Sequence, residues 1–309
     1  MKKILLILLV FISFIKVNAL SIDKMYIDSE IDISGNLLIK EVIEINNLNE
    51  DFDYKLYFKD MNLTLNDKNY YDGINISIEN IGLLNEDYDL NLLNKDDFKK
   101  YIKESNDIET IKNDNNYSVK IKKNNKKTYI YIDYMVLSLS VIHNDIAEFY
   151  YKYLNNLEYN IKELKIIFKL PYSSNTFDVY AHSNMKANIT KDDKNYLVII
   201  QKKDYKKDND LDLRVLYDKD LYQVVYNKNK KSNIDALDMI KNIENDRISS
   251  TKRNNILPYV FTSIIVILIV FLLQLFHILF LVHKYKIYVY VLIFHLDYWL
   301  VHKGYSLYL

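Results

Sequence analysis

The densest group of side chains capable of chemistry lies between residues 143 and 148. His143, Asp145 and Glu148 place an imidazole and two carboxylates within six residues. Such a group could hold a metal ion or work as an acid/base pair. The same spacing also fits helix capping, since Asp145 is a good N-cap and Glu148 follows three residues later, as in a capping box. We prefer capping, and predict no catalytic, cofactor-binding or metal-binding residue outright.

Few other side chains in the sequence could take part in catalysis. His182 has no chemical partner nearby in the sequence, and we expect it to be a half-exposed residue near the end of a strand. The chain contains no cysteine, which excludes thiolate zinc sites, thiol catalysis and iron–sulfur clusters. Its four glycines form neither a phosphate loop nor a dinucleotide-binding motif. The sequence therefore predicts a protein that is not an enzyme and uses no cofactor.

Alternation of apolar and polar residues dominates from residue 20 to residue 227, as expected of antiparallel strands that cover a core. Ser34, Gly35 and Asn36 form a turn signal between the first two strands. About ten such strands predict a mostly β domain, an antiparallel β-sandwich with room for two subdomains. The clearest alternating segments are 52–58, 74–79, 117–121, 164–170 and 211–217.

Three segments depart from this alternation. Residues 145–157 have apolar side chains at helical spacing and predict one helix inserted among the strands. Residues 83–112 are acidic and polar, which indicates an insertion or a small helix. Residues 234–248 are loosely amphipathic and predict a helix within a stalk, residues 228–256.

Two apolar segments point to a membrane. Residues 1–19 combine a basic start, a short apolar stretch and small residues before position 20, which predicts a signal peptide cleaved after Ala19. Residues 257–282 carry no charged side chain over 26 positions, about 39 Å of helix, which is enough for a transmembrane helix. These signals predict a single-pass protein of the cell membrane, with residues 20–256 outside and the C-terminus in the cytoplasm.

The predicted tail, residues 283–309, begins with basic residues and becomes apolar again from 287 to 296. We expect a short cytoplasmic or interfacial segment, although residues 287–301 could form a second span. Within the predicted transmembrane helix, Gln274 and His277 could mark a polar face for a partner helix.

Several stretches between residues 128 and 220 resemble the YciQ-like predicted membrane proteins of bacteria, whose exported domain is the domain of unknown function 2207. The resemblance extends over roughly residues 20–282 and implies an exported β-domain, a stalk helix and a membrane anchor. Members of that family usually continue beyond the first span, and the tail after Lys286 shows nothing similar. The matching stretches are 129–134, 141–151, 166–171, 179–182 and 213–220.

The functional hypothesis is a membrane-anchored cell-envelope protein whose β-domain binds a surface ligand or a protein partner. One alternative is a metal-dependent or hydrolytic enzyme centred on His143, Asp145 and Glu148, and another is a structural subunit of a membrane complex. The chain has 41 basic and 41 acidic residues and no basic tail, so we expect no binding to nucleic acid.

Overall fold

A computed structural model describes residues 20–57, 63–71, 74–84, 102–103, 107–114, 116–170, 172–183, 187–221 and 230–302. The predicted signal peptide lies outside these residues, as does the part of the 83–112 segment between residues 85 and 101. The chain divides into two compact units, one up to Lys241 and the other from Asn242 onward. The first unit contains the strands and the second is helical where it is described.

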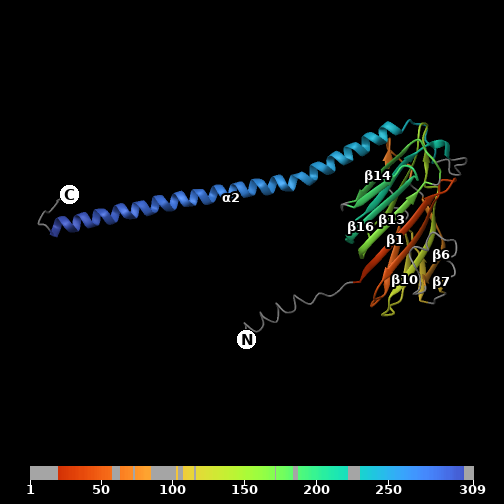
Figure 1. Ribbon diagram of the computed structural model, residues 1–309, viewed down its shortest axis with the longest axis horizontal. Helices are drawn as coiled ribbons and strands as arrows, with labels where there is room; N and C mark the ends of the chain where they lie inside the picture. The colour runs from red at the N-terminus through yellow and green to blue at the C-terminus, as the bar shows by residue number, and fades with distance from the viewer. Residues whose placement is uncertain are drawn as a thin grey trace. The chain divides into compact units, whose positions relative to one another are not determined.

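The larger sheet has eight strands in the order β15-β16-β13-β1-β2-β10-β6-β7 (Figure 1). β1 and β13 run parallel along nine paired positions, whereas the other described strand pairs of this sheet are antiparallel. The strands are β1 (Ser21–Ile31), β2 (Leu37–Ile45), β6 (Asn75–Leu84), β7 (Ile102–Lys103), β10 (Thr128–Leu137), β13 (Asn160–Lys169), β15 (Asn188–Asp192) and β16 (Leu197–Tyr205).

A second sheet of four strands packs against the first and completes the predicted β-sandwich. Its order is β11-β12-β17-β14, and smaller sheets β3-β9-β8 and β4-β5 belong to the same compact unit. These strands are β3 (Phe52–Tyr57), β4 (Thr64–Leu65), β5 (Lys68–Asn69), β8 (Ile108–Lys112), β9 (Asn116–Ile121), β11 (Val141–Ile142), β12 (Ala147–Leu154), β14 (Phe177–Ser183) and β17 (Leu211–Tyr217). A short 3-10 helix, η3 (Lys219–Leu221), follows β17.

Alternate residues of β12 face the larger sheet and close the core. The rings of Phe149 and Phe168 lie 4.6 Å apart, and the hydroxyl groups of Tyr153 and Ser29 are 2.6 Å apart. Because the sandwich has no disulfide to support it, these buried contacts must supply its stability. The turn between β1 and β2 forms at the predicted position, with Gly35 at a φ of +76° and Asp32 accepting hydrogen bonds from the N–H groups of Ser34 and Asn36.

The predicted helix at residues 145–157 is wrong, because Ala147–Leu154 form strand β12. Seven of the eight residues of β12 are buried, so both faces of the strand are covered. A strand that is covered on both faces loses the polar/apolar alternation, and its apolar positions then fit helical spacing equally well. The described part of the 83–112 segment is also extended, in β6, β7 and β8.

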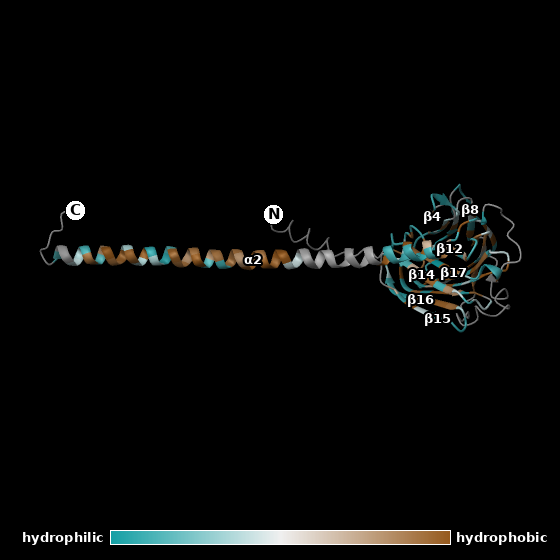
Figure 2. Ribbon diagram, turned by 90° about the horizontal axis from the view of Figure 1, so that it is seen from above, coloured by the Kyte–Doolittle hydropathy of each residue, from teal (hydrophilic) through white to brown (hydrophobic). Residues whose placement is uncertain are grey.

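One continuous helix, α2 (Leu237–His302), includes residues 237–248 of the predicted stalk helix and all of the predicted transmembrane helix. Residues Thr262–Trp299 are long and apolar enough to cross a membrane, and none of this segment is buried against protein. Figure 2 shows apolar residues along most of this part of the helix. Two polar residues, Gln274 and His277, fall inside the apolar segment, three positions apart and thus on one side of the helix.

Candidate binding site

The structure brings His143 and Glu148 together in the interior. The His143 Nε2 atom lies 3.2 Å from Glu148 Oε1, and both side chains are almost completely buried. The other Glu148 oxygen, Oε2, accepts a hydrogen bond from Arg214 Nε at 2.8 Å and lies 2.6 Å from Arg214 Nη2. Burial alone would raise the pKa of Glu148, but His143 and Arg214 hold that pKa below its ordinary value.

Asp145 points to a different part of the chain. Its two carboxylate oxygens accept hydrogen bonds from the backbone N–H groups of Ala236, at 2.7 Å, and Leu237, at 3.0 Å. Desolvation opposes the charge of Asp145, but these hydrogen bonds lower its pKa. The predicted capping box is wrong because no local helix exists, yet Asp145 does cap a helix, namely the start of α2 some 90 residues later.

This arrangement leaves the three predicted candidates little freedom for catalysis. The Glu148 carboxylate is hydrogen-bonded to both His143 and Arg214. The Asp145 carboxylate accepts hydrogen bonds from backbone N–H groups. Among the residues that the structure describes, no group of three or more His, Asp or Glu side chains is placed to hold a metal ion. The geometry is that of a buried, internally neutralised cluster that ties β12 to β17.

His182 has a partner that sequence reasoning missed. It pairs across the sheet with Asp212, and its Nδ1 atom is hydrogen-bonded to Asp212 Oδ1. The second Asp212 oxygen accepts a hydrogen bond from the Tyr150 hydroxyl at 3.0 Å. His182 is partly exposed near the end of β14, as expected from the sequence. Its partner lies 30 residues away, so only the strand pairing could reveal it.

A second buried carboxylate was also missed. Glu41 is fully buried in β2 and accepts hydrogen bonds from Tyr134, at 2.5 Å, and Tyr54, at 2.9 Å. Burial raises the pKa of Glu41 to about 7, although both tyrosines act in the opposite direction. The signal was available in the sequence, because Glu41 has the same parity as the core residues Ile39 and Ile43 in the alternating strand.

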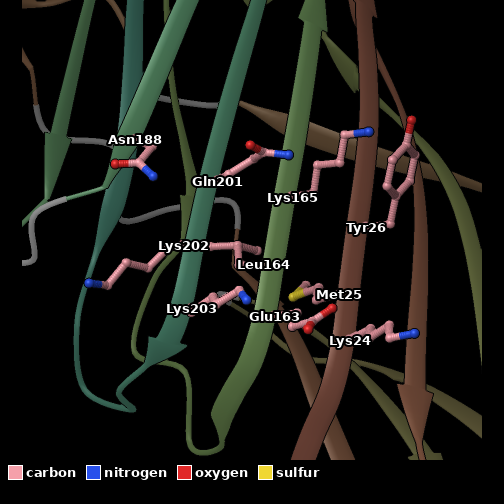
Figure 3. Close-up of a pocket in the computed structure, with 10 residues that line it drawn as sticks. All are labelled: Lys24, Met25, Tyr26, Glu163, Leu164, Lys165, Asn188, Gln201, Lys202 and Lys203. Carbon is pink, nitrogen blue, oxygen red and sulfur yellow. The ribbon is translucent and has the colours of Figure 1, made fainter.

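An open site of the β-domain is a groove of about 650 Å³ on the larger sheet, which we call the lysine groove. It crosses β15, β16, β13 and β1, and Figure 3 shows Asn188, Gln201, Lys165 and Tyr26 side by side across these strands. The strand register gives the same row: Tyr26 pairs with Lys165, Lys165 with Gln201, and Gln201 with Asn188. The remaining lining residues are Lys24, Met25, Glu163, Leu164, Lys202 and Lys203.

Comparison with known proteins identifies the family. The family described as predicted membrane protein (DUF2207) N-terminal domain matches residues 21–217, which include every strand from β1 to β17. The chain belongs to this family. The resemblance inferred from the sequence is therefore confirmed over residues 21–217, and the chain is a membrane protein with a C-terminal apolar helix. No curated protein sequence matches the chain.

Solved structures are similar to this DUF2207 protein only at a distance. An M1 zinc metallopeptidase from Deinococcus radiodurans has 6% sequence identity and a TM-score of 0.32, over 63% of this chain and 42% of the peptidase. The collagen adhesin of S. aureus has 6% identity and a TM-score of 0.19, over 64% of this chain and 83% of the adhesin. The chain thus spans about two fifths of the peptidase's length, and neither similarity carries an argument about activity.

Proposed function

We propose that this DUF2207 protein is a cell-envelope protein that α2 anchors in the cell membrane, with its β-domain outside as a ligand-binding module. The observation that carries the binding role is the lysine groove. The ionisable groups of the His143 cluster are neutralised internally, whereas the groove presents charged and amide side chains on an open sheet surface. A concave site in which several polar side chains converge is suited to binding a ligand from solvent.

The start of the β-domain supports the proposed signal peptide. Leu20 is buried, and its backbone nitrogen donates a hydrogen bond to Glu50 Oε1 at 3.1 Å. Cleavage after Ala19 would convert this nitrogen into a charged amino group that already has a carboxylate beside it. Such a charge-assisted hydrogen bond is stronger than a neutral one. N-terminal sequencing of the protein recovered from membranes should therefore begin at Leu20, and retention of Met1 would contradict cleavage.

Thermal melting tests the binding role. A ligand that binds only the native state raises its stability by RT ln(1 + [L]/Kd), which is about 2.7 kcal/mol at a concentration a hundred times Kd. We expect fragments of cell wall to raise the melting temperature of the purified protein. If wall fragments leave the midpoint unchanged up to millimolar concentration, the ligand-binding role is refuted.

A second role, as a subunit of a membrane complex, is favoured by Gln274 and His277. An amide and an imidazole on one side of an apolar helix find no water in a bilayer, and such groups commonly hydrogen-bond to neighbouring helices. The test is purification from mild detergent with and without the double substitution Gln274→Leu and His277→Leu. This role predicts that a specific membrane protein co-purifies with the wild type and is lost from the variant; equal recovery with both would exclude that use of the two residues.

A further inference from the structure

The lysine groove carries an excess of positive charge in a chain that is otherwise balanced. Lys24, Lys165, Lys203 and Glu163 share its open side, a formal charge of +2, whereas the whole chain has a net charge of zero. A second depression of the β-domain has the opposite character, with Asp51, Asp53, Asp107 and Glu109 beside Lys120 and Lys122. Positive charge is therefore concentrated on one part of the surface, which favours anionic ligands there.

Acidic side chains offset the positive charge at only one end of the lysine groove. Lys24 lies 3.8 Å from Glu44 and pairs across the strands with Glu163, which in turn pairs with Lys203. Lys165 instead lies over the ring of Tyr26, with its Nζ atom 5.3 Å from the ring centre. That contact positions the ammonium group and leaves its charge uncancelled.

The polar side chains of the groove form a row suited to a repeating ligand. Lys165, Gln201 and Asn188 occupy consecutive strands, and adjacent strands are about 4.8 Å apart. Lys203 and Gln201 are exposed on the same side of β16, two residues apart. Ammonium groups bind phosphate as point charges, while amides can donate to and accept from hydroxyl groups between successive phosphates.

We propose that the lysine groove binds a polymer with repeated phosphate groups, such as a polyol phosphate. This inference rests on the proposed function, since it names the ligand class of the proposed binding module. Lys165 and Lys203 contact the phosphates, and Gln201 and Asn188 contact the hydroxyl groups. Glu163 is the one repulsive group in the lining, and it limits the affinity.

The test measures binding of fluorescently labelled polyglycerol phosphate to the full chain in non-ionic detergent, by fluorescence anisotropy. The wild type should bind and should lose affinity as salt is raised. The double variant Lys165→Gln, Lys203→Gln should bind about fivefold more weakly, as expected for the loss of two charge contacts at the surface. Glu163→Gln should bind more tightly, a change that damage to the fold would not produce.

The matched control is Lys122→Gln, Lys123→Gln, which removes the same charge from exposed residues beyond the groove. It should bind like the wild type. Free inorganic phosphate and neutral dextran are the competitors: dextran should not displace the polymer, and phosphate should do so only at much higher phosphate concentration. Equal loss in both double variants would show unspecific charge attraction and overturn the proposal, as would displacement by phosphate at equal phosphate concentration.

Absence of binding by the wild type would also overturn the inference, without touching the proposed outward placement of the domain. Conversely, a domain found on the cytoplasmic side would refute the proposed function even if the purified protein bound the polymer. The two failures are therefore distinguishable, because binding is measured on purified protein and placement on intact cells.

Discussion

Replacing Glu41 with Gln should remove a pH-dependent loss of stability from the β-domain. Glu41 is completely buried between the sheets, and its carboxyl oxygens accept hydrogen bonds from the hydroxyl groups of Tyr54 and Tyr134. Burial raises its pKa in the folded state from 4.5 to about 7. The folded protein therefore holds this proton over a range in which the unfolded chain has already released it.

The sign and size of the effect follow from this difference. A raised carboxyl pKa contributes stability that is fully present below pH 4.5 and is lost as the pH rises through about 7. The folded and unfolded pKa values of Glu41 differ by about 2.5. A difference of one pKa unit corresponds to about 1.4 kcal/mol, so the total effect is about 3 kcal/mol. Relative to Glu41→Gln, the wild type should therefore lose about 3 kcal/mol of unfolding free energy between pH 4.5 and pH 8.

The assay is urea denaturation of residues 20–241, most of the chain's first compact unit, at several pH values. Circular dichroism is the suitable signal, because the one tryptophan, Trp299, lies in α2 outside this fragment. Glu109→Gln, at an exposed position in β8, provides the matched control and should leave the pH profile unchanged. Tyr134→Phe should move the loss of stability to higher pH, since its hydrogen bond lowers the pKa of Glu41. Parallel pH profiles of wild type and Glu41→Gln would show that burial does not raise the pKa of Glu41 in the folded state.

Four further predictions concern other parts of the β-domain, the first three measured by urea denaturation at pH 7 and the fourth by thermal melting. Glu148→Gln leaves the buried Arg214 without its carboxylate and should cost about 3–5 kcal/mol; a loss below 1 kcal/mol would contradict a buried ion pair. Asp145→Ala removes the cap of α2 and should cost about 1 kcal/mol, with Asp145→Asn costing less because it keeps one acceptor oxygen. Gly35→Ala should cost more than about 1 kcal/mol, since φ is +76° and the new Cβ would lie 2.9 Å from the Ser140 Cβ; an unchanged midpoint would show that the turn relaxes. Zinc should leave the melting temperature unchanged, and an increase that His143→Ala abolishes would favour the metal-site alternative instead.

The sequence predicts the β-sandwich and the apolar helix because both depend on local patterns. Alternation identifies β3 and β13, and a long stretch without charged residues identifies the apolar part of α2. The helix predicted at 145–157 failed for a local reason as well, since a strand covered on both faces has no alternation to recognise. The parallel pairing of β1 with β13 joins segments about 140 residues apart, and no local pattern specifies it.

In the candidate site, too, the sequence identifies individual residues but not the distant partners that the fold brings to them. The sequence identifies His143, Asp145 and Glu148 as notable residues, but their partners are distant: Arg214 is 66 residues from Glu148, and Ala236 is 91 residues from Asp145. The lysine groove is assembled from four strands whose order is fixed only by the tertiary fold. In a chain rich in lysine, no single groove residue is distinctive by itself.

Cysteine labelling of cells tests whether the β-domain lies outside the membrane. The chain has no cysteine, so Lys206→Cys, in an exposed turn after β16, and His302→Cys, at the end of α2, each introduce a single reactive thiol. Intact cells are treated with a maleimide that cannot cross membranes, before and after permeabilisation. Lys206→Cys should be labelled in intact cells, and His302→Cys should be labelled only after permeabilisation. Labelling of Lys206→Cys only after permeabilisation would place the β-domain inside the cell and refute the proposed topology.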